Sequence, residues 1–296
     1  MTRSARLEAR TAYIYLIPAF VGLTVLTYGP LLAVFGLSFT DLAGLKPHPS
    51  FVGFRNYVRL FTEDPYFIDS IKVTGYFAII SVLGSMVYSL TVAMLLNRKI
   101  PARGFFRAVF YLPYILPGAA VYIGWSWLYH DNFGLFNHLL RLAGIGRVMF
   151  IADSKWIVPS LALISVWLSG NLIVIFLAGL QNVPRVYHEA AEIDGANVWR
   201  RFIHITVPCM SPIIFYNLLM SLISNFQIVT PALVLTEGGP GNSSRFLTYI
   251  MYQYAFKQSR LGYASAVSFI FFILVGIFTS ILFATSKGWV FYEGDK

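Results

Sequence analysis

The chain has 296 residues, of which 57% are hydrophobic and only 12% are charged. A soluble domain carries about 25% charged residues, so this composition excludes an ordinary soluble globular protein. The single cysteine, Cys209, excludes a disulfide scaffold and any metal or iron–sulfur site held by four cysteines. A net charge of +9 would suggest nucleic acid in a soluble protein. In a membrane protein it more often reflects lysine and arginine in cytoplasmic loops, so we expect no nucleic-acid partner.

Six stretches lack Asp, Glu, Lys and Arg and are long enough to cross about 30 Å of hydrocarbon as helices. In chain order they are residues 12–39, 73–96, 108–129, 157–180, 207–235 and 262–286. We therefore predict an all-α, polytopic membrane protein with six transmembrane helices. Prolines within the stretches, among them Pro113 and Pro117, predict kinks. The membrane domain is expected at residues 11–287, between a short N-terminal segment at 1–10 and a tail at 288–296.

The distribution of lysine and arginine among the connections predicts the orientation. Twelve of the 22 basic residues fall on the side of the termini, and nine fall in the much longer loops of the other side. The densest group is Arg98, Lys99, Arg103 and Arg107, in the short second connection. We therefore place both termini in the cytoplasm.

The charge-free spans also restrict the mechanism. Proton-coupled carriers, voltage sensors and ion pumps usually need an ionisable group within the membrane, and the spans contain none. The sequence has no G-x-x-x-x-G-K-[ST] phosphate-binding loop, so it cannot hydrolyse ATP by that device. We expect no catalytic residues, no metal site and no enzyme activity of its own, and the energy for active transport would have to come from another subunit.

The connection at about residues 184–207 is unlike the others, because it combines charge with an amphipathic pattern. Gly195 is placed where a short helix could end in a left-handed residue, which predicts two short helices on the cytoplasmic surface. Such a segment often rests on lipid. Here Glu189, Glu192 and Asp194 would face anionic headgroups unfavourably, so a protein partner suits the mixed charge better.

The same connection resembles a known family motif. Glu189-Ala190-Ala191, then three residues, Gly195, nine residues and Ile205-Thr206-Val207-Pro208 is similar to the EAA loop of binding-protein-dependent ABC importer permeases, with Val207 where leucine is frequent. Phe54-Arg55-Asn56-Tyr57 and Leu235-Thr236-Glu237-Gly238-Gly239-Pro240 are weaker signatures that resemble the carbohydrate-import branch. The resemblance covers nearly the whole chain.

This resemblance implies a type I ABC importer permease in a bacterial-type cytoplasmic membrane. It implies a second homologous permease, two cytoplasmic ATPase subunits that use ATP and Mg²⁺, an extracytoplasmic solute-binding protein and a carbohydrate substrate, with no cofactor in this chain. The EAA loop would form a coupling helix that docks on the ATPase. The expected ATPase-coupling residues are Glu189, Ala190, Ala191, Asp194, Gly195, Arg200 and Pro208.

Uncharged polar residues within the spans are candidates for sugar contacts, because polar groups at bilayer depth point to a cavity or to neighbouring helices. Trp167 and Asn171 stand four residues apart in the fourth span, and a polar face follows the fifth span. The candidates are Trp167, Asn171, Asn217, Ser221, Ser224 and Asn225. The alternative is helix–helix hydrogen bonding, worth about 0.6 kcal/mol per contact. For Ser81, Ser85 and Tyr88 of the second span we expect packing.

Two other functions remain open from the sequence. The first is a permease for a glycerophosphodiester, glycerol-3-phosphate or a polyol, although a phosphorylated ligand would favour basic residues near its cavity. The second is a polytopic membrane enzyme, which would need clustered Asp, Glu or His at a membrane face. Only the 184–207 connection has such a cluster.

Overall fold

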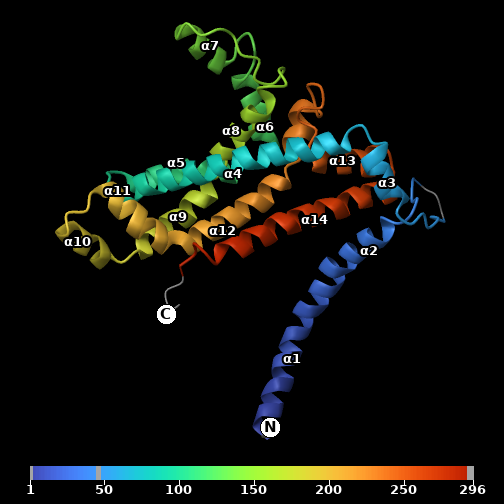
Figure 1. Ribbon diagram of the computed structural model, residues 1–296, viewed down its shortest axis with the longest axis horizontal. Coiled ribbons are helices and arrows are strands. Elements are labelled where there is room, and N and C mark those ends of the chain that lie inside the picture. The colour runs from blue at the N-terminus through green and yellow to red at the C-terminus, as the bar shows by residue number, and fades with distance from the viewer. Residues whose placement is uncertain (1–2, 45–47, 292–296) are drawn as a thin grey trace. The chain divides into compact units, whose positions relative to one another are not determined.

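The computed structural model describes residues 3–44 and 48–291 of the chain (Figure 1). Residues 1–2 of the predicted N-terminal segment and residues 292–296 of the predicted tail lie outside this description. Within the described part, secondary structure is helical apart from one isolated bridge between Thr40 and Phe51. The elements are α1 (Arg3–Leu23), η1 (Thr24–Tyr28), α2 (Gly29–Leu37), α3 (Arg55–Thr62), α4 (Phe67–Asn97), α5 (Arg103–Ile115), α6 (Gly118–Leu128), α7 (Leu135–Leu142), α8 (Ile157–Trp167), α9 (Gly170–Asn182), α10 (Arg185–Ile193), α11 (Val198–Arg201), η2 (Phe202–Thr206), α12 (Val207–Phe226), η3 (Ala232–Thr236), α13 (Leu247–Tyr252), η4 (Gln253–Lys257) and α14 (Leu261–Ser286), where η marks a π-helical turn.

The predicted polytopic all-α membrane fold is confirmed. Four continuous helical runs are long and apolar enough to cross a membrane: Thr11–Leu37, Phe67–Asn97, Val198–Phe226 and Leu261–Ser286. Two bent pairs, α5 with α6 and α8 with α9, bring the spans to six when each pair is counted as one span.

The bends are larger than a simple proline kink. The axes of α5 and α6 differ by 101°, and those of α8 and α9 by 49°. Leu116 between α5 and α6 is extended, with ψ 143°, as expected for a residue that precedes a proline, here Pro117. At the start of α9, a Cβ on Gly170 would lie 2.7 Å from the backbone oxygen of Phe110, so the absence of a side chain lets α9 approach α5 closely.

The fifth span also differs from the prediction at both of its ends. Its helix begins at Val198, within the 184–207 connection, and ends at Phe226 rather than at residue 235. Pro231 starts a new short helical turn beyond that end, consistent with the fit of proline to a first turn. The run passes through η2 just before Pro208, and a proline lacks the N–H that a regular α-helix would need there.

The chain divides into two compact units, of which the first comprises Met1–Asp64 and Ile250–Ile273. Two polar groups organise this unit. The Asn56 amide donates to the backbone oxygens of Ser38 and Thr40, at 2.8 and 2.9 Å. The Asp64 carboxylate accepts hydrogen bonds from the Tyr254 and Tyr263 hydroxyls, at 2.6 and 2.8 Å. Both groups therefore join segments distant in sequence.

The second unit comprises Pro65–Tyr249 and Leu274–Lys296, and α4 is at its centre. α4 packs along α8, α9 and α12 through a buried stripe with helical spacing that includes Ser81, Ser85 and Ser89. The Ser89 hydroxyl lies 2.8 Å from that of Ser169, at the bend between α8 and α9. Small and hydroxyl side chains are the usual contacts between helices in lipid, where apolar residues gain nothing by leaving the membrane.

Candidate functional site

The 184–207 connection forms two short helices separated at Gly195, as the sequence predicts. α10 ends at Ile193, and Gly195 has a left-handed backbone with φ +73°. The Ala196 N–H donates to the Ala191 oxygen at 2.8 Å, and the Gly195 N–H donates to the Glu192 oxygen at 3.1 Å. These two bonds are those of a Schellman helix ending. No atom lies within 4 Å of a Cβ built on Gly195, so the backbone angle rather than lack of space favours glycine.

The second short helix is continuous with the fifth span. The Asn197 side chain caps α11 by accepting a hydrogen bond from the Arg200 N–H at 2.9 Å. Arg201 forms an ion pair with Glu192 at 2.9 Å, which connects α11 back to α10. Because the Glu192 side chain is 69% exposed, this pair is worth at most about 1 kcal/mol. A displacement of α11 would nevertheless act directly on the span, because one helical run extends from Val198 to Phe226.

Four residues at helical spacing form one outward face of α10: Val186, Glu189, Ala190 and Ile193. We call them the α10 face. All four are exposed, including 68% of Val186 and 87% of Ile193. An exposed surface with two large apolar side chains, one carboxylate and one small residue is typical of a contact with another protein.

The other predicted coupling residues surround this face or lie apart from it. Ala191 is half-buried, and Asp194 and Arg200 are exposed. Pro208 is half-buried near the start of α12, where its oxygen accepts a hydrogen bond from the Ser211 hydroxyl at 2.7 Å. Pro208 therefore belongs to the beginning of the span and not to the exposed surface.

A second candidate site is a cavity of about 340 Å³ within the helices of the second unit. Its wall contains no Asp, Glu, Lys or Arg. Four of the predicted substrate residues lie in this wall: Asn171, Ser221, Ser224 and Asn225. The structure thus brings together polar residues of α9 and α12 around one uncharged space.

The remaining two substrate candidates do not line this cavity. Trp167 is the last residue of α8, and its ring packs 5.5 Å from that of Trp125 in an apolar cluster. The bend after Trp167 separates it from Asn171, so the expected common face is absent. Asn217 is fully buried and its amide donates to the Leu172 oxygen at 3.4 Å, while its own Oδ1 has no hydrogen-bond partner.

The cavity also contains residues that the sequence did not single out as ligands. Ser85 lines the wall, although the second-span serines were expected only to pack. Tyr114 and Tyr122 come from the two sides of the first bend, and Ser165 comes from α8, before the second. The Tyr122 hydroxyl is hydrogen-bonded to Ser165. These residues form no periodic polar pattern in the sequence that would predict a common site. The bends in the helices bring them together in the wall of the cavity.

Within the wall, part of the polar capacity is already used. The Asn225 amide donates to the Ser221 backbone oxygen at 2.8 Å and to the Ser221 hydroxyl at 3.2 Å. Ser224 is exposed and Asn171 is half-buried. Among residues 3–44 and 48–291, no group of three His, Cys, Asp or Glu side chains could hold a metal ion. The cavity is thus equipped for hydrogen bonding and not for charge.

The six-span helical fold, the uncharged cavity and the helical 184–207 connection with its exposed face fit a multi-pass transport protein. The chain belongs to the family of binding-protein-dependent transport system inner membrane components, whose profile matches residues 80–288. It is therefore a multi-pass protein of the inner membrane.

The chain is similar along its whole length to other permeases. It is 38% identical to a protein of Bacillus subtilis named as a probable ABC transporter permease, YesP, over 100% of this chain and 96% of that protein. It is 31% identical to the multiple sugar-binding transport system permease protein MsmF of Streptococcus mutans, over 97% and 99% of the two chains. A crystal structure of a bacterial ABC transporter involved in the import of alginate contains a chain of the same fold, with a TM-score of 0.81, 21% identity and coverage of 97% and 99%.

Proposed function

We propose that the chain forms half of the translocation pathway of an ATP-driven importer for a sugar or an oligosaccharide. The observation that carries this proposal is the uncharged cavity, whose wall presents hydroxyls, amides and the rings of Tyr114 and Tyr122. Sugars bind through hydrogen bonds to their hydroxyls and through aromatic faces, and such sites need no charge. A permease for phosphorylated solutes would instead place basic residues in this wall. The similarity to a multiple-sugar permease supports the same substrate class.

The energy for transport would come from a separate subunit. In this proposal two cytoplasmic ATPases use ATP and Mg²⁺, and one of them binds the α10 face. A second homologous permease supplies the other half of the pathway. An extracytoplasmic solute-binding protein delivers the sugar. ATPase closure would move α10 and α11 together, because the Schellman ending and the Glu192–Arg201 pair connect them. The run from Val198 to Phe226 would then transmit this movement to the Ser221 and Asn225 wall of the cavity.

Reconstitution tests this proposal. The tagged full-length chain, expressed from its own locus, should co-purify with an ATP-hydrolysing subunit, and proteoliposomes should accumulate a labelled oligosaccharide in the presence of ATP and the binding protein. ATP hydrolysis should rise only with the transported sugar. Accumulation of a phosphorylated solute in place of neutral sugars would contradict the substrate class, and an active chain that purifies alone as an enzyme would contradict the transport role.

A further inference from the structure

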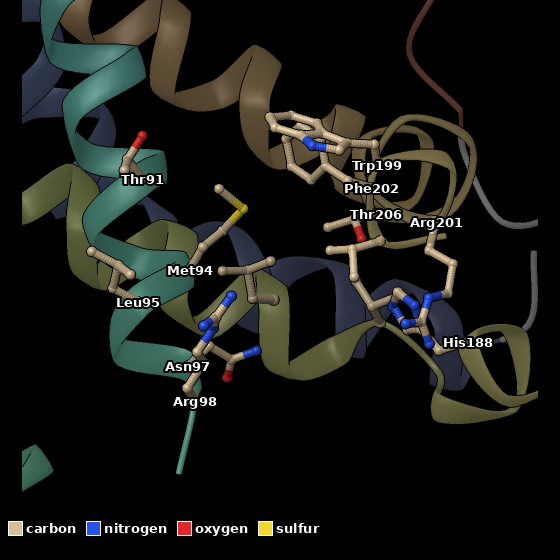
Figure 2. A pocket seen from close by; sticks show the side chains of 13 residues that line it. Thr91, Met94, Leu95, Asn97, Arg98, His188, Trp199, Arg201, Phe202 and Thr206 are labelled. Carbon is tan, nitrogen blue, oxygen red and sulfur yellow. The ribbon is translucent and has the colours of Figure 1, made fainter. Parts of the chain in front are cut away.

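A larger cavity, of about 460 Å³, lies at the cytoplasmic ends of the helices in the second unit (Figure 2). It is bounded by the last turns of α4 and α9 and by the beginning of the Val198–Phe226 run. Three membrane spans begin or end around it, so it is at the level where the hydrocarbon meets the cytoplasmic headgroups. The proposed sugar pathway makes no use of this cavity.

The wall combines a wide apolar surface with basic groups. Met94, Leu180 and Phe202 are among the apolar residues, and Trp199 at the rim is 72% exposed. Arg98 lies at the end of α4, across the cavity from Arg201 and His188, which Figure 2 shows close to each other. The lining residues include no Asp or Glu, but Arg201 keeps its 2.9 Å ion pair with Glu192 just outside the wall, so Arg98 is the main source of net positive charge. The wall therefore favours an amphiphile with a negatively charged head and an apolar chain.

The surrounding charge strengthens this preference. Arg98 and Lys99 directly follow α4, Arg103 and Arg107 lie in the first two turns of α5, and the sequence has no acidic residue between Asp69 and Asp131. The Arg103 side chain donates to the Leu96 oxygen at 2.5 Å and to the Asn97 Oδ1 at 3.3 Å. These bonds hold the end of α4, and with it the position of Arg98, at the mouth of the cavity.

We propose that this cavity is a binding site for one anionic phospholipid of the cytoplasmic leaflet. The lipid phosphate lies between Arg98 and Arg201, with the His188 ring as a further hydrogen-bonding partner, and an acyl chain lies along Met94, Leu180 and Phe202. Basic pockets between membrane helices on the cytoplasmic side are suited to anionic headgroups. The lipid would thus contact both α4 and the 184–207 connection.

Quenching of Trp199 fluorescence by brominated lipids tests the site. The full-length chain, isolated with any subunits that it retains, is placed in nanodiscs with brominated phosphatidylglycerol or brominated phosphatidylcholine, and the Trp199 signal is the difference from Trp199→Phe. Brominated phosphatidylglycerol should give the same quenching as brominated phosphatidylcholine at about fivefold lower mole fraction. A preference of about fivefold is the effect expected from one basic residue that contacts an anionic headgroup. Arg98→Gln should remove this preference.

Lys99→Gln is the matched control, because Lys99 is exposed, adjacent in sequence and outside the cavity wall. It should keep the preference for phosphatidylglycerol. Thr91→Phe, at an exposed lining position, should reduce quenching by both lipids because it fills the apolar part of the cavity. Equal quenching by both lipids in the unmodified chain would overturn the proposal, as would equal losses in the two charge variants. Absence of any quenching would show that a protein covers this wall, and would also overturn it. None of these outcomes depends on which solute is transported.

Discussion

Gly195, the left-handed residue between α10 and α11, allows the effect of backbone geometry on coupling to be separated from its effect on stability. Alanine at position 195 meets no atom within 4 Å, so Gly195→Ala costs only the left-handed backbone, about 1–2 kcal/mol. Proline fixes φ near about −65° and cannot adopt the observed +73°. Gly195→Pro therefore loses both hydrogen bonds of the Schellman ending, at about 1 kcal/mol each. The two costs are similar, but only proline must redirect α10 relative to α11.

The assay compares ATP hydrolysis with sugar uptake in proteoliposomes, after membrane insertion has been checked by protease protection. Gly195→Ala should retain most coupled uptake, whereas Gly195→Pro should insert normally and lose uptake at least about tenfold. A tenfold loss corresponds to destabilising the coupled state by about 1.4 kcal/mol. Glu189→Lys, on the α10 face, should also uncouple without affecting insertion. Uptake at the unmodified level in Gly195→Pro would refute the reasoning. An equally severe loss in Gly195→Ala would show that the backbone angle is not the cause.

Three further predictions concern packing, protonation and the cavity. Gly262→Ala places a Cβ against the backbone oxygen of Thr40 and should lower the free energy of unfolding by about 1–3 kcal/mol. Gly276→Ala, with open space around it, should change the free energy of unfolding little. Equal melting temperatures of the two variants in detergent would contradict this prediction. Burial, followed by the hydrogen bond and charge of Asp64, raises the pKa of Tyr254 above its ordinary 10.0, so the native state keeps a proton that the unfolded state loses. Denaturant titrations should thus show a contribution of Tyr254 to stability that is constant below about pH 10 and falls above it. Tyr254→Phe should flatten that fall and lower the free energy of unfolding at neutral pH by about 1.5–3 kcal/mol. An unchanged alkaline slope would exclude Tyr254 as the source of the fall. Asn171→Ala should reduce maximal sugar uptake about threefold to tenfold with insertion and basal ATP hydrolysis unchanged, and full uptake would remove Asn171 from the pathway.

Features with a local cause were predictable from the sequence. The apolar stretches correspond to the helices because lipid requires about 20 uncharged residues for each span. The break at Gly195 follows from the preference of glycine for left-handed backbone, and the structure shows it with φ +73°.

Features that depend on several helices were not predictable. Pro117 indicated a kink, but the 101° angle depends on what the two halves pack against. The four-residue spacing of Trp167 and Asn171 predicted a common helical face, and this prediction was wrong because the helix breaks after Trp167. The break directs Trp167 to the cluster around Trp125 and Asn171 to the cavity. Ser85 and Tyr122 carry no sequence pattern that separates a cavity wall from ordinary packing.

The central claim is that a separate ATPase acts on this chain through the α10 face, and site-specific photo-cross-linking tests it most directly. A photoreactive amino acid replaces Ala190, which is exposed on that face, or Phe133, which is 67% exposed in the loop after α6 and serves as the control. Irradiation of native membranes should give an adduct with the ATPase subunit from position 190 and none from position 133. The absence of an ATPase adduct at position 190, with the transporter active and assembled, would contradict the account.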